Sequence, residues 1–183
     1  MKLLDKPISL LAIAMLSSLM TLPAWAFDLD SDVPIKVNAD HARLDDNQGI
    51  ATYTGDVILT QGETRLDADR VVLFRNAEGL NRIEATGNPA HYRQPTRDGN
   101  GETDARATNI TWSAQDKQLT FEKDAVIKQN GNVFRGDLIH YDTVQRVVTA
   151  QGSPDDGSGS GRVEMVIQPR STKKGSDGSS QSQ

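Results

Sequence analysis

The residues best suited to acid–base or metal chemistry are the three histidines, His41, His91 and His140. A metal site needs several His, Cys or carboxylate ligands at short, regular spacings. The histidines lie in different segments, and none has a second histidine or a carboxylate at metal-ligand spacing. We interpret them as surface or structural histidines, and we predict no metal site and no cofactor.

Carboxylates offer the next candidates for chemistry. Residues 28–32 begin like a calcium-binding loop, but the sixth position is Val33 instead of glycine and the twelfth is Ala39 instead of glutamate. Asp45 and Asp46 are adjacent, and adjacent residues of a strand point to opposite faces, so they are unsuited to paired acid–base work. With no catalytic constellation in the sequence, we predict that the protein is not an enzyme.

Composition narrows the class of partner. The 183 residues include 25 Asp and Glu, 20 Lys and Arg and no Cys, with a formal net charge of −5. Nucleic-acid binding needs a basic surface that neutralises phosphates, so this balance argues against it. The lack of cysteine excludes disulfides, iron–sulfur clusters and thiol catalysis.

The elements that must carry any function are short strands. Segments with alternating apolar residues, such as 51–53, 57–59 and 71–73, are separated by Gly, Asn and Asp at turn-like positions. We count about sixteen antiparallel strands of four to seven residues, which indicates an all-β fold.

An internal repeat supports this interpretation. Residues 39–74 align without gaps on residues 107–142, a shift of 68 positions. Apolar residues two positions apart recur in both copies, as expected for strands with one buried face. Asp56 and Asp124, which recur after a Gly or a Lys, are interpreted as turn residues. The pattern predicts one sheet folded over on itself, a twisted open β-jelly roll or β-solenoid, with an apolar interior.

Such a sheet has open ends. We expect residues 33–39 and 162–168 to form its two edge strands, which are free to pair with other chains. Stacking by translation without closure gives filaments instead of closed dimers.

The N-terminal segment resembles a secretory signal peptide. Lys2 and Lys6 precede an apolar run from Ile8 to Leu22, and residues 24–26 read Ala-Trp-Ala, a small-residue cleavage site. We predict a cleaved signal over residues 1–26, a β-domain over residues 27–169, and a disordered, Ser-, Gly- and Lys-rich tail over residues 170–183. The mature protein is then expected to be exported and soluble.

Several phrases of the sequence resemble the OstA-like family. They are residues 34–40 (PIKVNAD), residues 53–62 (YTGDVILTQG), residues 66–72 (LDADRVV), residues 87–90 (GNPA) and residues 136–141 (GDLIHY). Their order, together with the repeat, covers residues 33–168. The resemblance implies a twisted β-jelly roll in the periplasm that joins head to tail and carries lipopolysaccharide from the inner to the outer membrane.

The resemblance also implies partners and a site. The partners would be lipopolysaccharide through its lipid A, further copies of the chain, and the inner-membrane-anchored and outer-membrane components of the transport machinery. The acyl chains would lie against the inward-facing apolar residues, which we predict to be Ile35, Val37, Leu44, Tyr53, Leu59, Leu66, Leu73, Tyr92, Trp112, Phe121, Ile127, Phe134 and Tyr141.

The alternatives left open are a sister domain of the same pathway, a polysaccharide-active β-solenoid enzyme, and a cargo-free β-fibre or adhesive protein. The enzyme would need converging carboxylates on one strand face, which the repeat lacks. The fibre would have a filled interior, and the sequence does not distinguish a filled interior from an open groove.

Overall fold

The computed structural model describes residues 27, 32–95, 101–153 and 161–169, and this part of the chain contains strands and no helix. The ten strands are β1 (Lys36–Asn38), β2 (His41–Asp45), β3 (Ile50–Gln61), β4 (Thr64–Asn76), β5 (Gly79–Pro95), β6 (Glu102–Ser113), β7 (Gln118–Gln129), β8 (Asn132–Asp142), β9 (Val148–Gln151) and β10 (Glu164–Val166). The predicted signal segment 1–26 and the predicted tail 170–183 lie outside the described residues.

The all-β prediction is confirmed, but the strand count of about sixteen is wrong. Six long strands, β3 to β8, each replace two of the predicted short ones. Each long strand bends near its middle, where the register with its neighbours shifts, for example between Thr54 and Val57 and between Glu122 and Ala125. The chain therefore turns a corner without leaving the sheet, as at a β-bulge.

The corners occupy equivalent places in the two copies of the repeat. Asp56 and Asp124, which are 68 residues apart, both have positive φ angles, of 40° and 55°. Aspartate tolerates this left-handed conformation better than most residues. The interpretation of these two residues as backbone turn residues is therefore confirmed, with the turn lying inside a strand.

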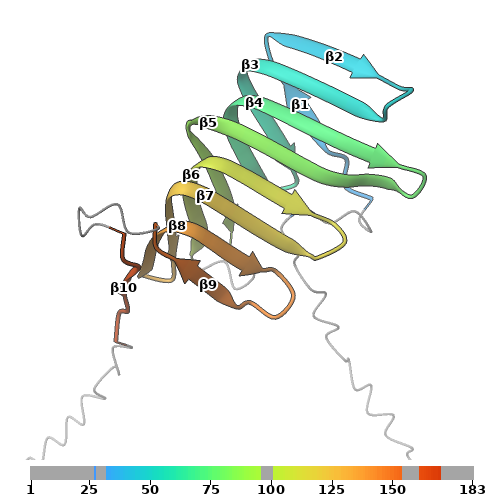
Figure 1. The fold of residues 1–183 in the computed structure, drawn as a ribbon. Helices are drawn as coiled ribbons and strands as arrows, with labels where there is room; N and C mark the ends of the chain where they lie inside the picture. Colours follow the sequence, from blue (N-terminus) through green and yellow to red (C-terminus); the bar gives the residue numbers. More distant parts are fainter. Residues whose placement is uncertain (1–26, 28–31, 96–100, 154–160, 170–183) are drawn as a thin grey trace, which may run out of the picture.

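All ten strands form one antiparallel sheet. The order is β1-β3-β4-β5-β6-β7-β8-β10, while β2 pairs with β3 and β9 pairs with β8 (Figure 1). The strands β1 and β2 thus end the sheet on one side, and β9 and β10 end it on the other. The predicted edge segments 33–39 and 162–168 contain β1 and β10.

The bends fold this sheet into two walls. The first wall comprises β2, β9 and residues 50–54, 70–76, 79–86, 109–113, 118–122 and 138–142; the second comprises β1, β10 and residues 57–61, 64–68, 90–95, 102–106, 125–129 and 132–136. In Figure 1 the first wall faces the viewer, with β1 behind it. The two walls enclose one apolar core.

Candidate functional site: the apolar interior between the walls

The register of the sheet builds the interior from rows of apolar side chains. Residues directly opposite each other in paired strands share a face of the sheet. On the first wall one row is Ala51, Leu73, Ile83, Trp112, Leu119 and Tyr141, and the next is Tyr53, Val71, Ala85, Ile110, Phe121 and Ile139. On the second wall the row is Val37, Leu59, Leu66, Tyr92, Ala105, Ile127, Phe134 and Met165.

The thirteen predicted site residues differ in burial. Seven are 6% exposed or less: Leu59, Leu66, Tyr92, Trp112, Phe121, Ile127 and Tyr141. Five are half-buried and pack against this core: Ile35, Val37, Tyr53, Leu73 and Phe134. Leu44 is 60% exposed, although it pairs with the inward-facing Ala51. Its strand, β2, ends the sheet, so no further strand covers it.

The middle of the interior is packed. Tyr92 of the second wall and Phe121 of the first wall meet edge to face, with ring centroids 6.3 Å apart. Gln129 of the second wall also donates a hydrogen bond to the Tyr141 hydroxyl of the first wall, at 3.4 Å. Side chains of the two walls thus touch across the middle, whereas apolar residues at the ends stay exposed.

Next to the apolar row of the second wall lies a row of buried polar residues, which borders the apolar interior. Gln61, Thr64 and Thr103 are buried, at 8%, 7% and 4% exposure, and Gln129 donates to the Thr103 hydroxyl at 2.8 Å. The Tyr92 hydroxyl donates to Gln94 Oε1 at 3.0 Å. Burial, reinforced by Tyr141, raises the pKa of Tyr92 well above its usual value, so the hydroxyl stays protonated and neutral at neutral pH.

The sequence missed part of this interior. The small side chains Ala85, Ala90, Ala105 and Ala107 face inward and are fully buried. Alternation of Ala105 and Ala107 with polar residues was the available signal. Phe27 is also buried, at 1% exposure, and gave no signal because it lies outside the repeated strand set.

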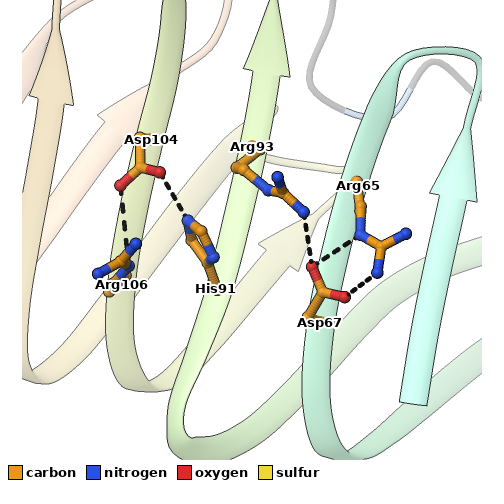
Figure 2. A network of polar contacts seen from close by, with 6 residues as sticks. All are labelled: Arg65, Asp67, His91, Arg93, Asp104 and Arg106. Carbon is orange, nitrogen blue, oxygen red and sulfur yellow. Dashed lines mark hydrogen bonds and ion pairs between the residues drawn. The ribbon is translucent and has the colours of Figure 1, made fainter. Parts of the chain in front are cut away.

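The outer face of the second wall carries a network of charges (Figure 2). Arg65 Nε donates to Asp67 Oδ2 at 2.9 Å, and Arg93 Nη2 approaches the same oxygen at 3.3 Å. His91 Nε2 lies 2.7 Å from Asp104 Oδ2, and Arg106 lies 3.9 Å from the other oxygen of Asp104. These side chains alternate with Leu66, Tyr92 and Ala105, so they point away from the interior.

The cations of this network lower the pKa of one carboxylate, Asp67. Burial alone would raise the pKa of Asp67, but the hydrogen bonds and charges of Arg65 and Arg93 outweigh burial and hold that pKa below its usual value. Asp67 is therefore an ionised partner that links β4 to β5. This arrangement ties the strands together and offers no free acid or base.

Among the described residues, no three His, Cys, Asp or Glu side chains gather in a way that could hold a metal ion. The same part of the chain has no helix that is long and apolar enough to cross a membrane.

Comparison with known proteins assigns the fold to a family. Residues 36–147 match the family described as LptA/(LptD N-terminal domain) lipopolysaccharide transport protein. The chain belongs to this family. The resemblance to the OstA-like family is thereby confirmed, and the matched segment begins at β1 and includes eight of the ten strands.

Individual members of the LptA/LptD N-terminal domain family match most of the chain. The chain is 36% identical to the lipopolysaccharide export system protein LptH of Pseudomonas aeruginosa, over 80% of this chain and 86% of that protein. It is 29% identical to the lipopolysaccharide export system protein LptA of Escherichia coli K12, over 87% of this chain and 85% of that protein.

A crystal structure of Pseudomonas aeruginosa LptH, the LptA-homologous periplasmic component of the lipopolysaccharide transport device, superposes on this chain with a TM-score of 0.67 at 38% identity. The match covers 75% of this chain and 96% of that one. Because family members are transport proteins, the comparisons support the interpretation that this chain is not an enzyme.

Proposed function

We propose that the protein carries lipopolysaccharide through the periplasm as a head-to-tail bridge, with the acyl chains held between the two walls. Lipopolysaccharide is the cargo for which the relative LptH is named, and the periplasm is the compartment given for the crystallised LptH. The location of the cargo follows from the interior, which gathers the apolar surface of a chain that is otherwise polar.

The observation that carries this proposal is the contrast between the middle and the ends of the sheet. The large apolar side chains that are exposed include Leu44 in β2 at one end of the sheet, and Val144, Val147, Met165 and Ile167 in or beside β9 and β10 at the other. Exposed apolar residues gathered beside unpaired strand edges mark a surface for another chain. A second copy placed on either end would continue both the sheet and the rows of inward-facing side chains.

The energetics of an acyl chain favour such a path. Burial of each CH₂ group is favourable by about 0.8 kcal/mol, so moving an acyl chain of about twelve carbons into water costs on the order of 10 kcal/mol of free energy. An apolar interior that continues from copy to copy removes most of this barrier. The sugars and phosphates of lipid A would lie beyond the polar row of the second wall, and the protein's negative charge would not hold the phosphates tightly.

The packed middle sets a condition on this mechanism. Tyr92 and Phe121 touch, so an acyl chain needs side chains to move or the walls to part. A cargo-free fibre is the competing function, and it would keep the interior closed.

Lipopolysaccharide binding by two neighbouring variants separates these functions. Tyr53 is half-buried and faces inward, while Thr52 lies next to it on the outer face of β3. We expect Tyr53→Asp to weaken binding of purified lipopolysaccharide by at least tenfold and Thr52→Asp to change it less than twofold. Circular dichroism confirms folding of both variants, and equal binding by the two would contradict the proposal.

A further inference from the structure

Phe27 is a buried residue that the sheet does not explain. It lies nine residues before β1 and belongs to none of the ten strands. Nevertheless its side chain is 1% exposed, and it ranks among the largest fully buried side chains of the molecule. The next described residues along the chain, Asp32 and Val33, are exposed.

The ring lies between the two walls. Its centroid is 6.0 Å from that of Tyr92 on the second wall, at an interplanar angle of 68°. It is also 6.0 Å from the centroid of Trp112 on the first wall, at 79°. Both are edge-to-face contacts, the favourable geometry for aromatic pairs. Phe27 thus fills a space in the middle of the interior that the sheet itself leaves open.

The walls and this ring differ in how they are held. Tyr92 and Trp112 are fixed by the register of β5 and β6, opposite Ala105 and Ile83 respectively. Phe27 has no place in that register, so the ring can leave without breaking a strand pair. The space it fills is apolar and is bordered by residues for which we propose acyl-chain contact.

We propose that the space between Tyr92 and Trp112 is a subsite for an acyl chain, and that Phe27 is its resident occupant, which an entering acyl chain displaces. The inference rests on the proposed function, because it names one position on the proposed lipid path. It also meets the condition set by the packed middle, since departure of one ring frees space between the walls.

An internal occupant has a consequence for affinity. The acyl chain binds only the fraction of molecules from which the ring has left, so the apparent affinity falls by that fraction. When the lipid moves on, the ring returns and keeps water out of the interior. Weak binding and ready release suit a protein that passes its cargo to a neighbour.

Two phenylalanines with the same burial provide a matched test. Phe27 is 1% exposed and Phe121, a wall residue in β7, is 0% exposed. We expect Phe27→Ala to bind lauric acid at least fivefold more tightly than the wild type, because it removes a competitor. Phe121→Ala is expected to bind it at least fivefold more weakly, because it removes part of the wall. Isothermal titration calorimetry measures both, and mass spectrometry checks that every variant begins at the same residue.

A second measurement does not depend on a destabilising substitution. The full chain is expressed with 4-fluorophenylalanine at position 27, and its ¹⁹F resonance is followed as lauric acid is added. We expect the resonance to move from a buried to a solvent-exposed position, with saturation at the same concentration as binding. Lauric acid that binds while the resonance stays unchanged would overturn the inference and leave the proposed function standing. Failure of both the wild type and Phe27→Ala to bind lauric acid or lipopolysaccharide would overturn both.

Discussion

At the scale of single residues, the two faces of one strand do different work. In β4, Leu66 faces the interior and is 1% exposed, while Arg65 and Asp67 on either side of it form an ion pair on the outer face. The same alternation in β5 places Tyr92 inside and His91 and Arg93 outside. At these positions apolar side chains face the interior and charged side chains face outward, within one or two residues of each other.

The Asp67 network predicts a pH dependence of stability. The pKa of Asp67 is lower in the folded protein than in the unfolded chain, so the folded state binds fewer protons near pH 4. Its contribution is complete above the unfolded value of about 3.9 and is lost as the pH falls through the folded value. Between pH 5 and pH 2.5 we expect the wild type to lose up to about 1 kcal/mol more stability than Asp67→Asn.

Urea denaturation at several pH values measures this difference. The control is Glu63→Gln, which neutralises an exposed carboxylate in the turn between β3 and β4. Parallel pH profiles for wild type and Asp67→Asn would contradict the assignment of Asp67 as an ion-pair anchor.

At the scale of elements, the presence of strands was easier to predict from the sequence than the residues at which each strand begins and ends. Alternation in segments such as residues 57–59, together with the 68-residue repeat, was enough for an all-β folded sheet. Gly and Asp are residue types that commonly form the turns between strands. In β3, however, Gly55 and Asp56 form a bend inside the strand, because a positive φ angle can produce either a turn or a bend. Local sequence does not distinguish a turn from a bend that keeps its pairing on both sides.

The site was predictable to the extent that it follows from alternation. The inward direction of residues such as Leu59 and Trp112 is fixed by the period of two, and both are buried. Whether the interior is filled depends on the distance between walls, which no local pattern encodes. Phe27 could not be predicted because its position depends on a contact with strands more than 60 residues away.

The proposed head-to-tail association predicts a role for the end strand β2. Leu44 is 60% exposed at this end, and burying a leucine is worth about 1.5–3 kcal/mol. We expect Leu44→Asp to weaken self-association at least tenfold and to change the free energy of unfolding by less than about 0.5 kcal/mol, because the site is exposed in one copy. Sedimentation velocity over a concentration series measures the association.

The adjacent Arg43 is the matched control for this prediction. It pairs with Thr52 on the outer face of the same strand and carries an exposed side chain. Arg43→Asp is expected to associate like the wild type. A similar loss in both variants would indicate that added negative charge, and not the loss of the apolar contact, is responsible.

At the scale of the whole molecule, the folded sheet does not close on itself and has an open edge at each end. The sheet ends in β1 and β2 on one side and in β9 and β10 on the other (Figure 1). The register carries the inward row of the second wall to both ends, at Val37 and Met165. In the middle of the sheet the apolar side chains are buried within one chain, whereas at the ends large apolar side chains stay exposed. Membership in the LptA/LptD N-terminal domain family and this unfinished shape together motivate a bridge that passes lipid along its interior.

In-cell photocrosslinking tests the proposed lipid path most directly. A photoreactive amino acid is placed at Trp112 in the middle and at Phe134 near the C-terminal end, both of which face inward. The controls are their neighbours Thr111 and Arg135, which alternate with them on the outer face. We expect lipopolysaccharide adducts at Trp112 and Phe134 and none at Thr111 and Arg135. Adducts at the outer positions alone, or at none of the four in folded, exported protein, would contradict the proposed lipid path.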